Sequence, residues 1–210
     1  MSEHCAELHK MFDGMKRYNF PFDVNGIPAN GIYVLFEKGE RAHGGDRIVR
    51  IGTHTGENQL RSRLNQHFLN ENKDRSIFRK NIGRCVLNKR QDDYLELWEK
   101  DLTSRKNKEK YGALIDRRFQ AMMEKEISEI IKSNFSFAVF EVKEKEDRIY
   151  CESRLVSEVS NCSICKPSDT WLGMHSPKNK IRESGLWQVQ QLYKTGFTED
   201  ELTNFMETFG

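Results

Sequence analysis

The sequence has no apolar run long enough to cross a membrane, little proline or glycine, and almost no net charge. A membrane-spanning helix needs about 18 or more consecutive apolar residues, and no stretch of the 210 residues approaches that length. Four prolines and fourteen glycines are too few for a low-complexity chain. Thirteen Phe, six Tyr and three Trp supply enough apolar surface for a packed core. Membrane and disordered proteins are therefore both disfavoured.

The charge balance and the cysteine count restrict the class of protein further. A net charge of +2, from 34 Lys and Arg against 32 Asp and Glu, argues against a wholly basic protein that coats nucleic acid. Five cysteines are an odd number and favour free thiols in a reducing compartment over a disulfide framework. Charged residues interrupt the first fifteen positions, so they form no export signal. We expect an intracellular, cytoplasmic protein.

The patterning divides the chain into three parts. Residues 1–29 are expected to form a leader, with a helix over 8–20 and then turns. Residues 30–165 are expected to hold the core, in which β-like runs at 32–36, 47–51 and 135–142 form a sheet and a flexible loop at 39–46 joins the first two. Helical patterns follow at 60–69 and 149–159, and the basic segment 76–89 is expected to be a helix or a loop. Residues 166–210 are expected to form a C-terminal extension that packs on the core.

A helical insertion is expected within the core, at about 90–134. It comprises a highly charged helix over 92–102, a basic connector at 105–110 and an amphipathic helix over 113–132. The C-terminal extension should contain a helix through Leu192 and Tyr193 and a last helix opened by a capping box, Thr198-x-x-Glu201. Its tryptophans are interpreted as core residues rather than as platforms for bases.

Four short motifs occur in order along the core. They are Gly31-Ile-Tyr33, Arg50-Ile-Gly52, Leu60-x-x-Arg63-x-x-x-His67-Phe68 and Glu152-x-x-Leu155-Val156. In content, order and secondary structure they resemble the GIY-YIG nuclease superfamily, over roughly residues 30–87 and 135–160. The resemblance implies an α+β fold with a GIY-YIG-type core, in which helices flank a small three-stranded antiparallel sheet.

The motif residues match the needs of phosphodiester cleavage. That reaction requires a group to activate water, a cation to neutralise the phosphate and usually a divalent metal held by a carboxylate. The resemblance implies that Tyr33 orients or deprotonates the water and that Arg63 contacts the scissile phosphate. It further implies that His67 supports the phosphate or accepts the proton, and that Glu152 binds Mg²⁺, with Mn²⁺ as a substitute.

The second motif departs from the family pattern, because Arg50 stands where the family name places tyrosine. This substitution removes one candidate base and adds a guanidinium. A tyrosine phenol ionises only near pH 10, so Tyr33 as a base would depend on nearby cations such as Arg50 and Arg63. His54, just past the motif, is an alternative base because an unperturbed imidazole titrates close to neutral pH.

Each motif residue also has a purely structural interpretation. Tyr33 could be a half-buried strand aromatic, and Arg63 a solvated helix cation. His67 could lie on a helix face without a function, and Glu152 could pair with Arg148 one turn before it. The joint order of the motifs favours the catalytic interpretation.

Basic residues concentrate around the motifs. Residues 46–90 contain eleven Lys or Arg and four Asp or Glu, a net charge of +7, whereas residues 92–101 contain five acids and one Lys. This segregation predicts a phosphate-binding face opposed to an acidic helix. The candidate DNA-binding residues are Arg61, Arg79, Lys80, Arg84 and Lys89. The alternative is a solvated charged surface.

A cysteine pair near the end of the core is a candidate zinc site. Cys162-x-x-Cys165 could bind zinc together with Cys151 and His175. A structural site normally joins two short ligand clusters, however, and a second pair is missing here. Structural zinc is therefore not expected, and the cysteines are interpreted as small core residues.

The sequence as a whole predicts a Mg²⁺-dependent endonuclease that hydrolyses DNA, and the C-terminal extension over 166–210 is expected to contact that DNA. Its length and layout resemble the short GIY-YIG restriction endonucleases, which implies site specificity. Because one site cuts one strand, double-strand cleavage implies a homodimer. One alternative is a catalytically weakened nucleic-acid-binding module on the same fold, and another is a repair or mobile-element nuclease that recognises DNA structure. A third is an interaction protein whose fold is stabilised by zinc.

Overall fold

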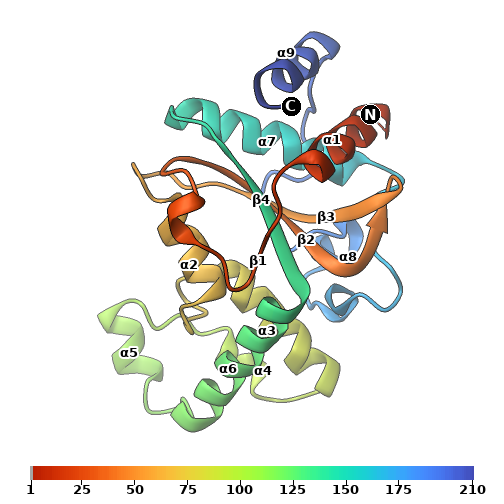
Figure 1. Ribbon diagram of the computed structural model, residues 1–210. Coiled ribbons are helices and arrows are strands. Elements are labelled where there is room, and N and C mark those ends of the chain that lie inside the picture. The colour runs from red at the N-terminus through yellow and green to blue at the C-terminus, as the bar shows by residue number, and fades with distance from the viewer. Residues whose placement is uncertain (1) are drawn as a thin grey trace.

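A single antiparallel sheet forms the centre of the molecule. The computed structural model describes residues 2–210, and within them the strand order is β1-β4-β2-β3 (Figure 1). The strands are β1 (Tyr18–Asn19), β2 (Gly31–Ala42), β3 (Gly45–Gly52) and β4 (Phe135–Glu141). The three-stranded sheet expected from the sequence lacks β1. Two residues are too few to show an alternating pattern, and β1 exists only through its pairing with β4.

The β2–β3 hairpin is longer and tighter than expected. Its ladder continues to the pair Ala42↔Gly45, so the flexible loop expected over 39–46 is instead strand on both sides of a two-residue turn. Both turn residues, His43 and Gly44, have left-handed backbones, with φ of 51° and 80°. Two positive φ angles match the right-handed twist of a hairpin. Polar composition alone concealed this turn, because histidine is not a typical turn residue.

Nine α-helices accompany the sheet within the described residues. They are α1 (Ser2–Gly14), α2 (Leu60–Phe68), α3 (Ile77–Arg90), α4 (Leu95–Trp98), α5 (Arg105–Tyr111), α6 (Arg117–Asn134), α7 (Lys145–Asn161), α8 (Asn179–Ser184) and α9 (Glu199–Phe209). Two short 3-10 turns, η1 (Val24–Gly26) and η2 (Leu172–His175), complete the fold. None of these helices is both long and apolar enough to span a bilayer.

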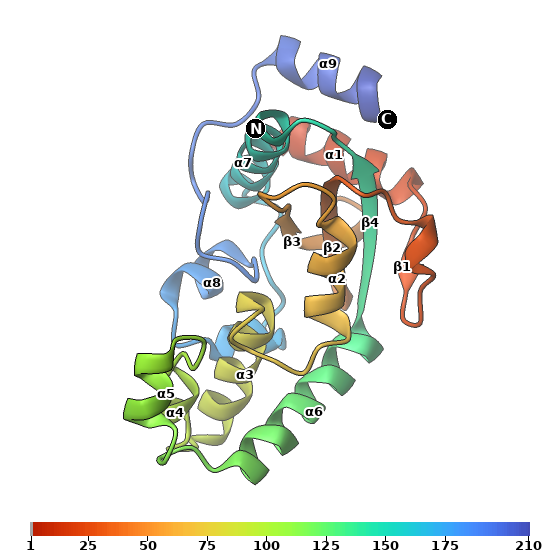
Figure 2. The ribbon, with the colours of Figure 1, turned by 90° about the vertical axis from the view of Figure 1, so that its left-hand side faces the viewer.

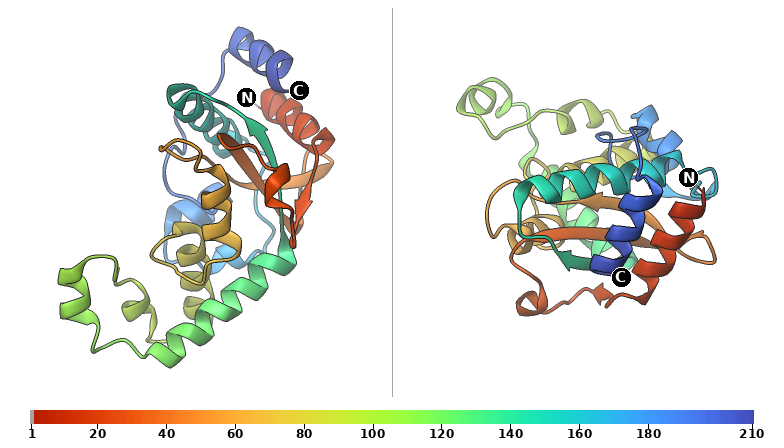
Figure 3. Two further views of the ribbon diagram at one scale, coloured as in Figure 1. Left: turned by 60° about the vertical axis from the view of Figure 1, so that its left-hand side comes forward. Right: turned by 90° about the horizontal axis from the view of Figure 1, so that it is seen from above.

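The sheet separates two hydrophobic cores. Alternate residues of β2 point to opposite faces, so Ile32 and Val34 pack with α1, α7 and α9 while Tyr33 and Leu35 pack with α2, α3 and α6. Figure 2 shows the two groups of helices on either side of the sheet, and the right-hand view of Figure 3 shows α1, α7 and α9 lying over it. The second core also takes in tryptophans from the C-terminal part, Trp171 and Trp187.

Several helices follow the sequence pattern and others do not. The structure confirms helices close to the expected positions for α3, α6, α7 and α9, and Thr198 and Glu201 form the expected capping box. The first helix ends at Gly14 and does not reach residue 20. Of the charged helix expected over 92–102, only α4 forms, and the expected connector at 105–110 is instead helix α5, which projects from the body (Figure 3).

The helix expected through Leu192 and Tyr193 does not form. Residues 185–198 run between α8 and α9 without helical structure. Gln191 and Tyr193 have φ of 63° and 58°, which a right-handed helix cannot include. This irregular segment proves important, because it covers one side of the motif residues.

Candidate active site

Three motif residues meet on one face of the sheet. Tyr33 in β2 is fully buried, and its hydroxyl lies 2.8 Å from Nε2 of His67 on α2. Arg50 on β3 donates from Nε to the same hydroxyl oxygen over 3.3 Å. Its Nη1 donates to the carbonyl oxygen of Trp187 over 2.6 Å. The structure therefore joins the first three motifs through one phenol group.

The motif glycines allow this close packing. Tyr33 lies opposite Gly52 in the β2–β3 ladder, and a Cβ at position 52 would lie 2.3 Å from the Tyr33 hydroxyl oxygen. A Cβ at Gly31 would lie 2.1 Å from the carbonyl oxygen of Phe140 in β4. No side chain fits at either distance, so close approach requires glycine at both positions.

His67 lies buried between the hydroxyl groups of Tyr33 and Ser76. Burial lowers the pKa of His67 well below its usual value, and the charges of Arg50, Arg63 and Arg79 lower it further. The neutral ring must donate from one nitrogen and accept at the other. The Tyr33 oxygen accepts from Arg50, and in the tautomer with a proton on Nδ1 the Tyr33 O–H donates to Nε2 of His67 while Nδ1–H donates to the Ser76 hydroxyl 2.7 Å away.

Glu152 lies on α7, across a small cavity from this group. The cavity has a volume of about 270 Å³ and is lined by Arg50, Ile77, Glu152 and residues 188–191. Burial raises the pKa of Glu152, while Arg50, a backbone hydrogen bond from Thr53 and Arg63 oppose the rise. The carboxylate thus lies within electrostatic range of both motif arginines.

The structural interpretation of Glu152 as a partner of Arg148 is wrong. Arg148 is fully buried, donates to backbone carbonyls that include that of Val142, and pairs with Glu57 over 3.4 Å. Among residues 2–210, Glu152 forms no ion pair. Its oxygens therefore face the cavity without a cationic partner in direct contact, which suits a carboxylate that binds a hard cation.

Arg63 is also without an acidic partner in the part of the chain described. Its Nη1 donates to the Gln66 side chain over 3.1 Å and to the Arg75 carbonyl over 3.2 Å. The guanidinium helps to line a second cavity, of about 250 Å³, together with Thr53 and His54. A half-buried cation with only neutral acceptors is available for a phosphate.

His54 lines the second cavity but is not placed as a base. Its Nδ1 donates to the Gly56 carbonyl over 2.7 Å, and its Nε2 accepts the Gly31 N–H over 3.3 Å. Both ring nitrogens are thus used by the backbone, and burial lowers the pKa of His54. The structure therefore does not support its expected role as a replacement base, and His54 instead holds the start of β2.

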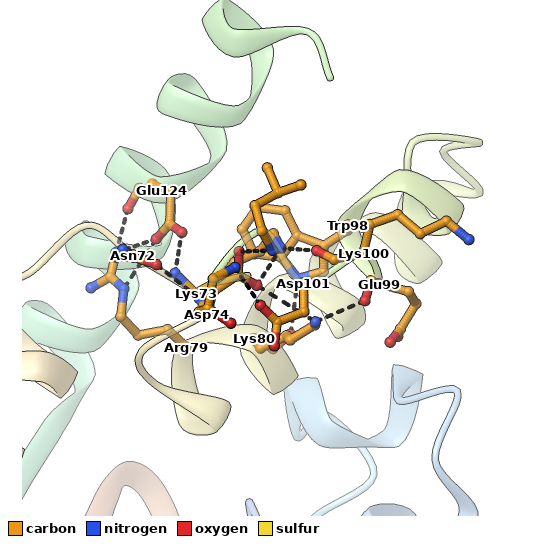
Figure 4. A network of polar contacts seen from close by, with 12 residues as sticks. Asn72, Lys73, Asp74, Arg79, Lys80, Trp98, Glu99, Lys100, Asp101 and Glu124 are labelled. Carbon is orange, nitrogen blue, oxygen red and sulfur yellow. Dashed lines mark hydrogen bonds and ion pairs between the residues drawn. The ribbon is translucent and has the colours of Figure 1, made fainter. Parts of the chain in front are cut away.

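Three of the expected DNA-binding cations lie inside the protein. Arg79 is fully buried and pairs with Glu124 of α6 over 2.9 Å. Lys80 donates to the Glu99 carbonyl over 2.8 Å, as Figure 4 shows, and Arg84 pairs with the Glu99 carboxylate over 2.5 Å. These side chains are used in packing α3 against its neighbours and do not form a phosphate-binding face.

The expected separation of charge is therefore wrong for this region. The acidic stretch after α3 folds back onto the basic residues: its Glu99 pairs with Arg84, and its Lys100 carbonyl accepts from Lys73 over 2.7 Å (Figure 4). Helix α3 packs on α4, α6 and η2, so most of its faces are covered. Of the expected cations, Arg61 is half-buried with Nε on the Ile27 carbonyl, and Lys89 is exposed.

The site includes residues that the sequence did not single out. Ser76 caps α3 through the Arg79 N–H and also contacts His67. Its position just before a helical run was a usable signal. Trp187 and Gln188 run beside β3, where the Trp187 N–H donates to the Val49 carbonyl and the Gln188 side chain accepts from Ile51. No local sequence pattern predicts such long-range pairing.

Comparison with known proteins gives one match. The family model described as GIY-YIG domain matches residues 2–209, which is nearly the whole chain. No curated protein and no solved structure matches the chain significantly.

Proposed function

The chain belongs to the GIY-YIG domain family of nucleases, and we propose that it is a Mg²⁺-dependent endonuclease that hydrolyses phosphodiester bonds in DNA. The observation that carries the proposal is the contact of Tyr33 with both His67 and Arg50 beside the cavity that holds Glu152. A proton acceptor, two cations and a carboxylate without an ion-pair partner lie within one small region. This is the set of groups that phosphodiester hydrolysis requires.

Tyr33 and His67 form the proton path. The neutral imidazole of His67 accepts the hydroxyl proton of Tyr33 while the Tyr33 oxygen takes a proton from the attacking water. The three arginines that disfavour a charged His67 are offset when the phosphate adds negative charge nearby. Ser76, which accepts from Nδ1, fixes the ring orientation for this transfer.

Arg50 controls access to Tyr33. Tyr33 is fully buried and Arg50 is 6% exposed, so the guanidinium covers the phenol. A substrate phosphate is a charged acceptor and binds a guanidinium more strongly than a phenol oxygen or a carbonyl does. We expect Arg50 to turn toward the phosphate, together with Arg63, and so to open the Tyr33 oxygen to water.

Glu152 would hold the metal ion. Its carboxylate lines the cavity together with Gln190 and Gln191, and oxygen ligands of this kind are those that Mg²⁺ prefers. When bound, Mg²⁺ polarises a phosphate oxygen and stabilises the charge of the leaving group. Mn²⁺, with the same preference for oxygen, is expected to substitute.

Nicking of supercoiled plasmid tests the proposal. We expect the wild type to nick DNA with Mg²⁺ or Mn²⁺ and not with a chelator present. Glu152→Gln and Arg63→Ala should both abolish nicking. Glu146→Gln, an exposed carboxylate on the same helix, is the matched control and should retain full activity. Equal activity in Glu152→Gln and the wild type would refute the metal-binding role.

Site specificity and a homodimer are the finer parts of the proposal. They rest on the resemblance of this chain in length and layout to short restriction endonucleases. A two-fold dimer would place two sites on opposite strands of a palindrome. Sequencing the ends from a digested genome should reveal one short common sequence with a constant stagger. Ends that cluster at branches or gaps would instead indicate a nuclease that recognises DNA structure.

A binding module without catalysis is the second candidate. Arg50 in place of the second motif tyrosine is the observation that favours it, because a candidate water-positioning hydroxyl is missing. In that case the wild type, Glu152→Gln and Arg63→Ala would all leave every DNA substrate intact while retaining measurable binding. Metal-dependent nicking by the wild type alone would exclude this candidate.

A further inference from the structure

Two cysteines and two histidines meet at the turn end of the β2–β3 hairpin. Cys5 and His9 come from α1, His43 from the hairpin turn, and Cys165 from the segment after α7. One ligand atom from each residue lies within 4.8 Å of all the others. Three of the four side chains are buried and His43 is half-buried.

The sulfur and nitrogen atoms are spaced as ligands of one ion. The Cys5 and Cys165 sulfurs lie 3.4 Å apart, much farther than a disulfide bond of about 2.05 Å. Around a tetrahedral zinc with Zn–S of about 2.3 Å, two sulfurs lie roughly 3.8 Å apart and a sulfur and a nitrogen roughly 3.6 Å apart. The Cys165 sulfur and Nε2 of His9 are 3.7 Å apart.

The tautomer of His9 suits a metal ligand. Its Nδ1 lies 2.8 Å from the Cys5 carbonyl oxygen, which requires a proton on Nδ1 and leaves a lone pair on Nε2. Metal-binding histidines are typically oriented by such a carbonyl on the other nitrogen. The Ile48 N–H also reaches Nε2, over a long 3.3 Å, and a bound metal would replace that weak contact.

His43 and Cys162 complete the surroundings. The rings of His43 and His9 lie 4.7 Å apart between centroids. Nε2 of His43 is 3.3 Å from the Cys162 sulfur, so Cys162 borders the group without being one of the four. The left-handed backbone of His43, with φ of 51°, turns this residue back over the end of the hairpin.

We propose that Cys5, His9, His43 and Cys165 form a structural Zn²⁺ site. Two thiolates and two imidazoles are a ligand set typical of zinc. Four protein ligands leave no open position, so the site would be structural rather than catalytic. It would tie the first helix and the segment after α7 to the hairpin turn.

This site is separate from the proposed catalytic cavity. Tyr33 lies near the start of β2 and His43 just past its end, ten residues later, and an extended strand of that length spans roughly 30 Å. It also differs from the Cys162, Cys165, Cys151 and His175 set considered from the sequence. Only Cys165 is common to the two sets: Cys5 and His9, one helical turn apart at the other end of the chain, and His43 stand in place of Cys151, Cys162 and His175.

Metal analysis of the full-length protein tests the site. After purification with a reductant and without chelators, we expect about one zinc per chain. Replacing zinc with Co²⁺ should give the visible bands of a tetrahedral ion and a sulfur-to-cobalt charge-transfer band. Cys5→Ser and Cys165→Ser should lose most of the zinc. Cys85→Ser, a buried cysteine in the other core, is the matched control and should retain it.

Other outcomes would overturn the site or its ligand set. Metal-free protein that gives no Co²⁺ bands on titration would refute it, whether its thiols are free or non-reducing mass spectrometry shows a Cys5–Cys165 disulfide. Zinc lost in Cys162→Ser but kept in Cys5→Ser would refute the assigned ligands. Because serine variants could fail to fold, the Co²⁺ titration of the wild type decides the question without them. A second variant is His43→Asn, because asparagine tolerates the left-handed turn backbone. It should bind zinc at least ~10-fold more weakly than the wild type. None of these readouts depends on nuclease activity.

Discussion

At the scale of single residues, the Tyr33 hydroxyl is the group on which the proposed mechanism depends most. It forms hydrogen bonds with both Arg50 and His67. Tyr33→Phe removes it without changing the ring. We expect single-turnover plasmid nicking to fall by at least ~100-fold, the usual contribution of a proton-transfer group. Stability should fall by only about 1–3 kcal/mol, because one hydrogen-bond partner is lost on each side.

Tyr18→Phe is the control for that variant. Tyr18 also lies in the sheet, but its hydroxyl donates to the Gly26 carbonyl at the surface. Its loss should leave the nicking rate unchanged. A Tyr33→Phe enzyme as fast as the wild type would mean that another group activates the water.

Gly52 offers a test of the packing that positions Tyr33. A methyl group at position 52 would overlap the Tyr33 phenol, with 2.3 Å to its oxygen. In Gly52→Ala we expect the phenol to move, which would break its contact with His67 and lower nicking by at least ~100-fold. Gly14→Ala places a methyl group in open space and should cut DNA normally. Wild-type activity in Gly52→Ala would show that the contact is dispensable.

Glu37 should make stability depend on pH. Burial raises the pKa of Glu37 to about 7, although it accepts indole N–H groups from Trp187 and Trp171 over 2.8 and 2.7 Å. Between its unfolded pKa of about 4.5 and its folded pKa, the folded state binds more protons than the unfolded state. Its contribution is therefore fully present below about pH 4.5 and is lost as pH rises through 7.

Glu37→Gln cannot ionise and should remove this dependence. Urea unfolding at pH 5 and pH 8 should show that the free energy of unfolding of the variant, relative to that of the wild type, increases by up to about 3 kcal/mol as pH rises. The exposed Glu141 on β4 supplies the control, because Glu141→Gln should show no such change. A constant difference between Glu37→Gln and the wild type at both pH values would contradict the assignment.

At the scale of elements, helix α3 shows that basic residues in a sequence need not form a surface that binds phosphate. Its basic residues look from the sequence like a phosphate-binding face, yet Arg79 is fully buried against Glu124. A buried ion pair is strongly destabilised when one partner is removed. We expect Glu124→Ala to lower the free energy of unfolding by about 3–5 kcal/mol, measured by urea titration, and to leave the DNA affinity of the folded protein unchanged.

Glu126→Ala on the same helix is the matched control. Glu126 pairs with Arg90 at the surface, and such pairs contribute about 1 kcal/mol or less. If both variants lose equally little stability, the buried pair is not what holds α3 to α6. If Glu124→Ala weakens DNA binding specifically, Arg79 reaches DNA after all.

Elements with strong local signals could be predicted, and elements formed by distant partners could not. The helical spacing of α6, the alternation of β4 and the capping box of α9 all lie within one segment. Strand β1 depends on β4, more than a hundred residues later. The irregular segment after α8 is held by contacts such as Trp187 to Val49, which no window of sequence contains.

The same distinction applies to the candidate site. Ordered motifs were sufficient to select Tyr33, Arg50 and His67, which the fold brings into contact. Their hydrogen-bond partners come from elsewhere and could not be inferred. His54 shows the limit most clearly, since its two nitrogens are used by Gly56 and Gly31, a fact of backbone geometry rather than of residue type.

At the scale of the whole molecule, the net charge conceals how few cations are available for DNA. Of the eleven basic residues between positions 46 and 90, six form ion pairs with acids: Arg47, Lys73, Arg79, Lys80, Arg84 and Arg90. The other five have no acidic partner within residues 2–210: Arg50, Arg61, Arg63, Arg75 and Lys89. The fold thus neutralises more than half of this basic block internally.

The number of unpaired cations should determine how strongly the DNA affinity depends on salt concentration. Each neutralised phosphate contributes about −0.9 to the slope of log affinity against log salt concentration. Five contacts from this region would give a slope of about −4.5, whereas eleven would give about −10.

We propose to measure binding of Tyr33→Phe, which should not cut, to duplex DNA by fluorescence anisotropy without divalent ions. A slope near −4.5 would support the five-cation face, and Arg63→Ala should make it shallower by about 0.9. Arg84→Ala should leave the slope unchanged, because Arg84 pairs with Glu99. A slope near −10 for Tyr33→Phe itself would mean that the internal ion pairs open when DNA binds.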